Sequence, residues 1–238
     1  MKAGSKTGMP RILTDKEWAT RHLREGEKWI EGYLKSLDHP HRSFLIDKMR
    51  KYSPIRSVLE IGCATGPNLY LIARNFPDAE ILGIDINPMV VQKGNEWFEK
   101  NGISNVRLEI GKAQELNRFA DDSFDVVLTD AVLIYISPDG IKQVVKEMIR
   151  ISRALMLCEW HLFNKWSALL WNAYYCLRLK KEAFKFKSAS LGFFVGHWVR
   201  DYCSLSKSLA PDRKVGITKI DKLWDDKSWQ KWGAIIEI

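Results

Sequence analysis

The 238-residue sequence contains only four cysteines, and no two of them form a C-x-x-C pair: Cys63, Cys158, Cys176 and Cys203. This spacing argues against a disulfide framework and a zinc site, and it is typical of reduced thiols in the cytoplasm. No apolar run reaches the roughly 18 residues that a membrane-spanning helix needs. The beginning of the sequence also lacks the apolar segment of a secretory signal. We therefore expect a cytoplasmic protein.

The sequence has no internal repeat and no low-complexity linker, and its 46% hydrophobic and 28% charged residues describe an ordinary globular protein. Its net charge of +8 is unevenly spread. Residues 1–56 carry 13 Lys and Arg against 7 Asp and Glu, residues 57–158 carry 10 against 14, and residues 159–238 carry 14 against 8. The basic flanks suit either a solvated surface or an anionic partner, such as RNA or an anionic membrane surface. No pattern indicates the oligomeric state.

From residue 57 onward, short apolar runs alternate with helical segments. Strands are expected at 58–61, 81–86, 106–110, 124–129 and 154–159, and helices at 67–76, 88–100 and 138–150. This alternation requires parallel strands with helices on both faces of the sheet. Two final strand-like runs, 215–220 and 232–238, are joined by a polar loop. The predicted fold class is therefore α/β, with a doubly wound, mostly parallel seven-stranded sheet.

We expect a single domain over residues 1–238, built in four parts. A helical N-terminal extension (1–56), with a second helix from about residue 41 to 51, precedes a ligand-binding core (57–160); a helical cap (161–214) and a terminal strand pair (215–238) follow.

Within the cap, residues 161–187 are expected to form an aromatic helix, and residues 188–205 a loop and a further helix around "GHWVRDY". The aromatic helix either covers a substrate pocket, rests on a membrane surface or simply packs on the N-terminal helices. Its candidate pocket residues are Trp166, Trp171, Tyr174 and Tyr175.

The most informative stretch is a glycine turn, "GCATG", between the first strand and the first core helix. Its backbone N–H groups and the helix N-terminus favour a carboxylate or a phosphate. Asp85 ends the next strand, 19 residues after Gly66, where a carboxylate can bind both hydroxyls of a ribose. The turn does not match G-x-G-x-x-G, and Glu60 would repel a pyrophosphate. A ligand with a ribose and a positive centre, S-adenosylmethionine, fits this charge pattern better than NAD.

Four segments in order resemble the motifs of class I (Rossmann-like) S-adenosylmethionine-dependent methyltransferases: "VLEIGCATG", "ILGIDINPMVV", "LEIGKAQEL" and "SFDVVLTDAVLIYI". The resemblance covers roughly residues 57–160 and implies a Rossmann-like fold that binds S-adenosylmethionine and releases S-adenosylhomocysteine. The implied cofactor-binding residues are Glu60, Gly62, Cys63, Gly66, Asn68, Asp85, Ile86, Ala113, Gln114, Asp130 and Ala131.

Two positions depart from the family pattern. Ala64 replaces the usual middle glycine of the turn, which we expect to be tolerated through a negative φ at that residue. Lys112 replaces the acidic residue that usually precedes Ala113, so Gln114 or the backbone would have to bind the adenine amine.

The resemblance implies an enzyme that transfers a methyl group to oxygen or nitrogen of a small or medium-sized organic acceptor. An RNA methyltransferase that uses the basic flanks, and a non-catalytic cofactor-binding scaffold, are the alternatives. An alcohol or phenol acceptor must lose a proton, for which the candidate catalytic residues are His161, Asp130 and Tyr135. No paired carboxylate and amide follow Asp130, so no metal site is predicted.

Overall fold

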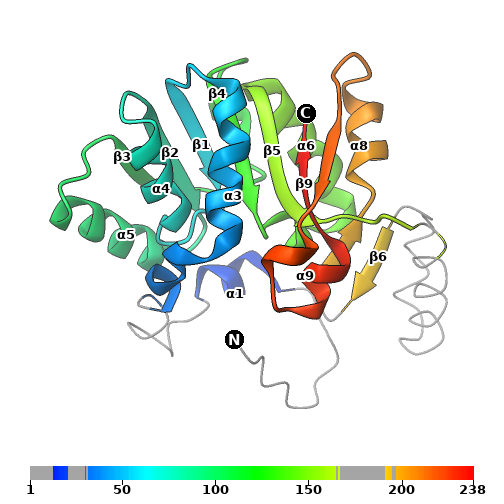
Figure 1. The fold of residues 1–238 in the computed structure, drawn as a ribbon, viewed down its shortest axis with the longest axis horizontal. Helices are drawn as coiled ribbons and strands as arrows, with labels where there is room; N and C mark the ends of the chain where they lie inside the picture. The colour runs from blue at the N-terminus through cyan, green and yellow to red at the C-terminus, as the bar shows by residue number, and fades with distance from the viewer. Residues whose placement is uncertain (1–12, 21–29, 31, 165, 167–190, 195–196) are drawn as a thin grey trace.

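The computed structural model describes residues 13–20, 30, 32–164, 166, 191–194 and 197–238, and its centre is a seven-stranded sheet (Figure 1). Its strands, in their order across the sheet, are β3 (Val106–Ile110), β2 (Glu80–Asp85), β1 (Ser57–Ile61), β4 (Phe124–Asp130), β5 (Ser152–Trp160), β9 (Gly233–Glu237) and β8 (Gly216–Lys219). β1 to β5 pair in parallel, and β9 is antiparallel to both of its neighbours. The predicted doubly wound, mostly parallel α/β sheet is confirmed.

The sheet is covered by helices on both faces (Figure 1). The described α-helices are α1 (Asp15–Ala19), α3 (Pro40–Met49), α4 (Pro67–Asn75), α5 (Pro88–Lys100), α6 (Pro138–Ile151), α8 (Tyr202–Leu209) and α9 (Lys227–Trp232). Short 3₁₀ turns are η1 (Lys35–Asp38), η2 (Arg50–Tyr52), η3 (Leu116–Arg118), η4 (Leu133–Tyr135) and η6 (Asp221–Leu223). In the part of the chain that the structure describes, no helix is long and apolar enough to cross a bilayer.

The two faces of the sheet carry separate apolar cores because neighbouring side chains of a strand point to opposite faces. In β4, Val126 and Leu128 pack in the core that includes residues of α3, α4, α5 and α9, whereas Val127 packs in the core that includes residues of α6 and α8. Several helices start where the sequence dictates: Pro67, Pro88 and Pro138 each occupy the first turn, where the missing N–H costs nothing.

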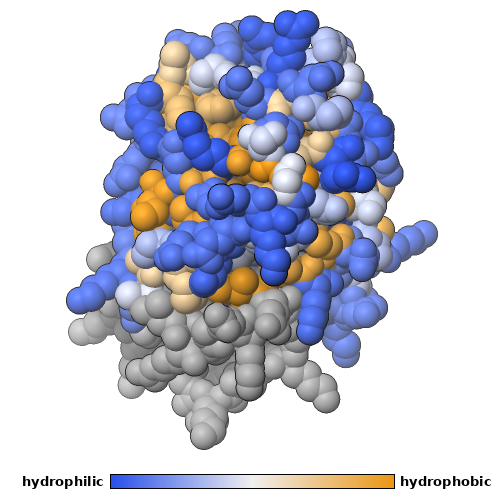
Figure 2. All heavy atoms as spheres, turned by 90° about the vertical axis from the view of Figure 1, so that its left-hand side faces the viewer, coloured by the Kyte–Doolittle hydropathy of each residue, from blue (hydrophilic) through white to orange (hydrophobic). Residues whose placement is uncertain are grey.

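The edge strand β3 carries the charged residues Arg107 and Glu109. Glu109 pairs with Arg107 and with Arg118, both at 3.0 Å. The surface at this side of the molecule is mostly hydrophilic, with apolar side chains gathered between the polar ones (Figure 2). Charges on an edge strand discourage pairing with a strand of another chain.

The sequence predicted every strand of the core, and two predictions outside it were wrong. The segment around "GHWVRDY" forms a strand, β7 (His197–Arg200), paired with β6 (Leu191–Phe194), before α8 begins. Leu162 N–H donates to the carbonyl of Arg200, so a strand partner that the local sequence does not reveal holds this segment extended. The connection expected as a polar loop contains η6 and α9. Trp171, Tyr174 and Tyr175 lie outside the described residues.

The glycine turn after β1 is wound through left-handed backbone. Gly62 has a φ of +72° and Gly66 of +82°, and a Cβ at Gly62 would collide with the side chain of Val132. The expectation of a negative φ at Ala64 was wrong, because this residue has a φ of +50°. Its N–H donates to Oδ2 of Asp85 at 2.9 Å, and this bond holds the residue in the left-handed region.

We predict that Ala64→Gly stabilises the protein by about 0.5–1 kcal/mol, because an L-residue other than glycine is strained at this φ. Urea unfolding at equilibrium measures the difference. Ala73→Gly, in the interior of α4, is the control and should destabilise by about 1 kcal/mol or more. Equal losses in the two variants would contradict the strain at Ala64.

Candidate active site

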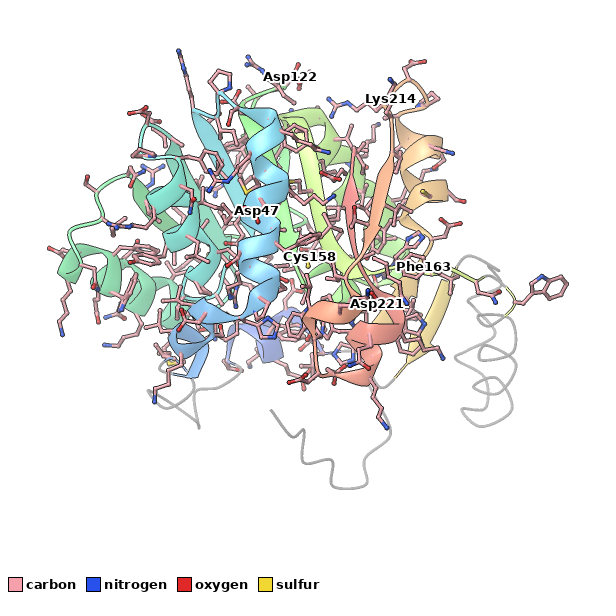
Figure 3. All side chains as sticks on the ribbon, viewed as in Figure 1. Asp47, Asp122, Cys158, Phe163, Lys214 and Asp221 are labelled. Atoms are coloured by element: carbon pink, nitrogen blue, oxygen red, sulfur yellow. The ribbon has the colours of Figure 1, made fainter. Side chains whose placement is uncertain are left out.

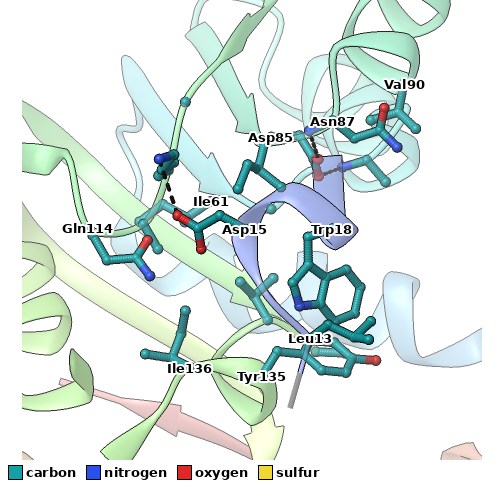
Figure 4. Close-up of a pocket in the computed structure, with 18 of the residues that line it drawn as sticks. Leu13, Asp15, Trp18, Ile61, Asp85, Asn87, Val90, Gln114, Tyr135 and Ile136 are labelled. Atoms are coloured by element: carbon teal, nitrogen blue, oxygen red, sulfur yellow. Dashed lines mark hydrogen bonds and ion pairs between the residues drawn. The ribbon is translucent and has the colours of Figure 1, made fainter. Parts of the chain in front are cut away.

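A cavity of about 500 Å³, called the main cavity because the predicted site residues gather at it, lies where β1, β2, β3 and β4 reach their carboxyl-terminal ends (Figure 4). Ligands of open α/β sheets bind at this edge. Its lining residues are Leu13, Asp15, Trp18, Tyr33, Ile61, Gly62, Ala64, Asp85, Ile86, Asn87, Val90, Gly111, Lys112, Ala113, Gln114, Asp130, Ala131, Val132, Tyr135, Ile136 and Ser137.

Asp85 is fixed between the glycine turn and the start of α5 (Figure 4). Its Oδ2 accepts the N–H of Ala64 and its Oδ1 accepts the N–H of Asn87, both at 2.9 Å. Burial raises the pKa of Asp85, and these backbone N–H groups oppose the rise. A carboxylate oxygen can accept more than one hydrogen bond, so Asp85 still has acceptor capacity at the cavity wall.

Most, but not all, of the predicted site residues line the main cavity. Those that line it are Gly62, Asp85, Ile86, Ala113, Gln114, Asp130, Ala131 and Tyr135. Those that are not among its lining residues are Glu60, Cys63, Gly66, Asn68 and His161. Cys63, like Cys158 within β5 (Figure 3), is buried, and burial raises the pKa of both thiols well above the usual value.

Glu60 and Asn68 form a buried pair next to the turn. Nδ2 of Asn68 donates to Oε1 of Glu60 at 2.7 Å, and each residue is 2% exposed. Burial raises the pKa of Glu60 to about 8, although the hydrogen bond from Asn68 opposes this rise. Oε2 of Glu60 is buried and has no hydrogen-bond partner among the described residues. An acceptor left unpaired in a protein interior is costly unless a ligand uses it.

Asp130 links this pair to the N-terminal helix α3. Its Oδ2 accepts from Nδ2 of Asn68 at 3.1 Å and from Nη1 of Arg42 at 3.4 Å, and it lies 2.9 Å from Nε2 of His41. Burial alone would raise the pKa of Asp130, but His41, Arg42 and Asn68 together hold it well below its usual range. Asp130 is therefore a carboxylate, and His41 is the donor.

Sequence analysis missed His41 and Arg42, as well as the residues before α3 that close the cavity. Helix α1 contributes Asp15 and Trp18 to the cavity wall. Asp15 pairs with Lys112 at 3.1 Å, and the rings of Trp18 and Tyr135 lie 4.3 Å apart between centroids (Figure 4). Lys112, at the position where the family usually has an acid, thus holds α1 at the cavity wall through its ion pair with Asp15.

The loop after β4 is held in place by two buried ionisable residues, Glu159 and Arg200. Glu159 accepts the N–H groups of Val132, Leu133 and Ile134 at 2.9–3.2 Å. Arg200 donates to the carbonyl oxygens of Leu133 and Ile136. Burial raises the pKa of Glu159 to about 7, against the effect of these N–H groups. Because this loop carries Tyr135, the two residues fix one wall of the cavity.

His161 does not take the position expected of a general base. It is 4% exposed, and its Nδ1 accepts the N–H of Tyr202 at 3.3 Å. Burial lowers the pKa of this imidazole. Since His161 does not line the main cavity and its Nδ1 is engaged by the backbone, we do not assign a proton-transfer role to it. No group of three His, Cys, Asp or Glu residues in the described part of the chain is arranged to hold a metal ion.

A family model described as a methyltransferase domain matches residues 54–181, which is more than half of the chain. The chain belongs to this family of methyltransferase domains. It is 27% identical over 129 residues to the malonyl-[acyl-carrier protein] O-methyltransferase of Acetivibrio thermocellus. This alignment covers 54% of this chain and 44% of that protein. The methyltransferase domain spans between 21% and 44% of the length of curated relatives that it matches.

Solved structures share the fold of this methyltransferase domain. An O-methyltransferase family protein from Burkholderia thailandensis aligns with a TM-score of 0.61 at 11% identity, over 95% of this chain and 65% of that one. A geranyl diphosphate methyltransferase in complex with GPP and sinefungin aligns with a TM-score of 0.58 at 14% identity, over 83% of this chain and 76% of that one. At these identities the likeness concerns the fold alone.

The polar groups of the methyltransferase domain match what S-adenosylmethionine offers. The acceptor capacity of Asp85 suits ribose hydroxyls, and the unpaired Oε2 of Glu60 suits a positively charged group. These acceptors, one at the cavity wall and one beside the glycine turn, thus fit the cofactor that the family motifs imply.

Glu60 should make the unliganded domain less stable as the pH rises. Its pKa of about 8 in the folded state is above its usual value of 4.5, so between about pH 5 and 8 the folded state retains a proton that the unfolded chain has lost. This group then lowers the free energy of unfolding by about 1.4 kcal/mol per pH unit. We predict that Glu60→Gln removes this slope, as measured by urea unfolding at several pH values. Glu80→Gln, at an exposed position, is the control. Parallel slopes in Glu60→Gln and the native protein would contradict the prediction.

Proposed function

We propose that the protein is an S-adenosylmethionine-dependent methyltransferase that modifies oxygen or nitrogen of a small or medium-sized organic acceptor. The observation that carries this proposal is the position of Asp85, which ends β2 at the wall of a cavity that begins at the glycine turn. Membership of the methyltransferase domain family and the concave shape of the site support it.

The cofactor would lie across the ends of β1, β2 and β4. Asp85 would accept the ribose hydroxyls, and Ile86, Ala113 and Gln114 would border the adenine. The ionised Asp130 would attract the cationic methionine end, and the unpaired Oε2 of Glu60 would accept a hydrogen bond from it. A bound cation would in turn favour the ionised form of Glu60. These proposed roles follow the family motifs, and most of the residues concerned line the main cavity.

S-adenosylmethionine, when bound, supplies a methyl carbon activated by its sulfonium. The protein's task is then to exclude water and to align the acceptor atom with that carbon. Tyr33 and Tyr135 border the cavity near Asp130, so the acceptor would enter on this aromatic side. Of the candidate catalytic residues, Asp130 and Tyr135 line the cavity. Asp130 would be a weak base because its pKa is held low, so its proposed role is electrostatic.

The proposal is tested by calorimetry with S-adenosylhomocysteine and NAD side by side, followed by incubation of cell-extract fractions with the methyl-labelled cofactor. Binding of S-adenosylhomocysteine and label in a small molecule would support it. NAD binding alone would overturn it, and label in RNA with a steep salt dependence would favour an RNA methyltransferase instead.

We predict that Asp85→Ala weakens the binding of S-adenosylhomocysteine by roughly 1.5–3 kcal/mol, because a charge-assisted bond to the ribose is lost. The variant should still fold, although its free energy of unfolding should fall by about 1–2 kcal/mol as Ala64 loses its hydrogen-bond acceptor. Asp78→Ala, an exposed aspartate before β2, is the matched control and should bind like the native protein. An unchanged affinity in Asp85→Ala would show that this carboxylate does not hold the ligand.

A further inference from the structure

The first turn of α3 places basic side chains where a helix normally disfavours them. His39 caps the helix, Pro40 begins it, and His41 and Arg42 follow, with no acidic residue in the turn. A cation near a helix N-terminus, such as the guanidinium of Arg42, opposes the helix dipole. His41 is 2% and Arg42 5% exposed, so water does not screen them. Such a local conflict is expected where another part of the fold, or a function, requires these side chains.

Asp130 supplies the compensating charge. Nε2 of His41 lies 2.9 Å from its Oδ2, and Nη1 of Arg42 lies 3.4 Å from the same oxygen. Arg42 is fixed by further bonds: Nη1 donates to Oδ1 of Asn68 at 2.5 Å, and Nε and Nη2 donate to the carbonyl and hydroxyl of Ser36 at 2.9 Å. The guanidinium therefore cannot turn away without breaking several hydrogen bonds.

These charges are not what docks α3 on the sheet. Leu45, Ile46 and Met49 are buried on the helix and belong to the apolar core. Buried charge pairs contribute little to stability, since desolvation offsets the attraction. The shared target of His41 and Arg42, in contrast, is a carboxylate at the wall of the main cavity.

We propose that His41 and Arg42 are positioning residues of the cofactor site. They hold the Asp130 carboxylate ionised and oriented at the cavity wall, where it attracts the cationic methionine end of the cofactor. This role depends on the function proposed above, and it makes the N-terminal extension a functional part of the site. The titratable and charged groups that face Asp130 from the surrounding elements are Tyr33, His39, His41, Arg42, Glu60, Cys158 and Glu159.

The test is the binding of S-adenosylhomocysteine to Arg42→Met and His41→Gln, measured by calorimetry from about pH 8 to about pH 5. Each variant removes one of the two side chains of α3 that bind Asp130, so burial is then opposed only by the remaining one and by Asn68. Asp130 should therefore take up a proton at a higher pH than in the native protein. Affinity should therefore fall as the pH is lowered, by about tenfold or more relative to the native protein at the acidic end.

Arg50→Met is the matched control, because Arg50 lies one residue beyond α3 with its side chain 56% exposed. It should follow the native pH profile. Asp130→Asn should bind weakly at every pH, and His41→Gln should then cause no further loss of binding in this background. If Arg42→Met does not fold, the comparison of Asp130→Asn with the double variant Asp130→Asn, His41→Gln still tests the proposal.

Several outcomes would overturn the proposal. These are native pH profiles in both variants, a loss that is uniform across pH and matches a fall in thermal stability, or an undiminished effect of His41→Gln in the Asp130→Asn background. Failure of the native protein to bind S-adenosylhomocysteine at all would overturn the proposed function together with this role. Native binding with unaltered variants would overturn the role alone.

Discussion

The structure depends on placing carboxyl groups inside a protein at one edge of a sheet. Glu60, Asp85, Asp130 and Glu159 come from β1, β2, β4 and β5, at or within two residues of the carboxyl-terminal end of each strand. An isolated buried carboxylate is very costly, so each must find donors or retain a proton. The four acids differ in the groups that donate hydrogen bonds to them, and these donors determine the geometry of the site.

The donors come from different parts of the chain. Asp85 uses backbone N–H groups of the glycine turn and of the α5 start, and Glu159 uses those of the loop after β4. Asp130 uses side chains of α3 and α4, whose charge and hydrogen bonds keep it ionised. Glu60 has one amide donor, no described residue hydrogen-bonds its second oxygen, and its pKa rises to about 8. The same hydrogen bonds therefore order the turn, the loop and the N-terminal helices around one cavity.

The N-terminal extension and the loop after β4, which are far apart in the sequence, both contribute side chains to the wall of this cavity. Trp18 of α1 packs on Tyr135, and Asp15 pairs with Lys112. The departure from the family pattern at Lys112 thus has a structural partner that the core motifs do not contain. Side chains from outside the core motifs thus cover part of the cavity and reduce the access of water to a ligand bound there.

Sequence patterns were sufficient wherever a short-range rule acts. Alternating apolar runs predicted all five core strands, and prolines in the first turn marked the helices α4, α5 and α6. The glycine turn and Asp85 could be placed because their spacing belongs to a single βαβ unit. The "GHWVRDY" strand was missed because its partner strands, and not its own residues, hold it extended.

The sequence by itself determined the parallel sheet, the turn and the carboxylates that end its strands, since each follows from the periodicity or spacing of nearby residues. Only the tertiary structure decided that His41 and Arg42 face Asp130, 89 and 88 residues away, that Ala64 adopts a positive φ, and that His161 lies outside the cavity. The physical reason is that charge pairing and burial depend on distance in space, and no local pattern encodes which distant side chains the folded chain brings together.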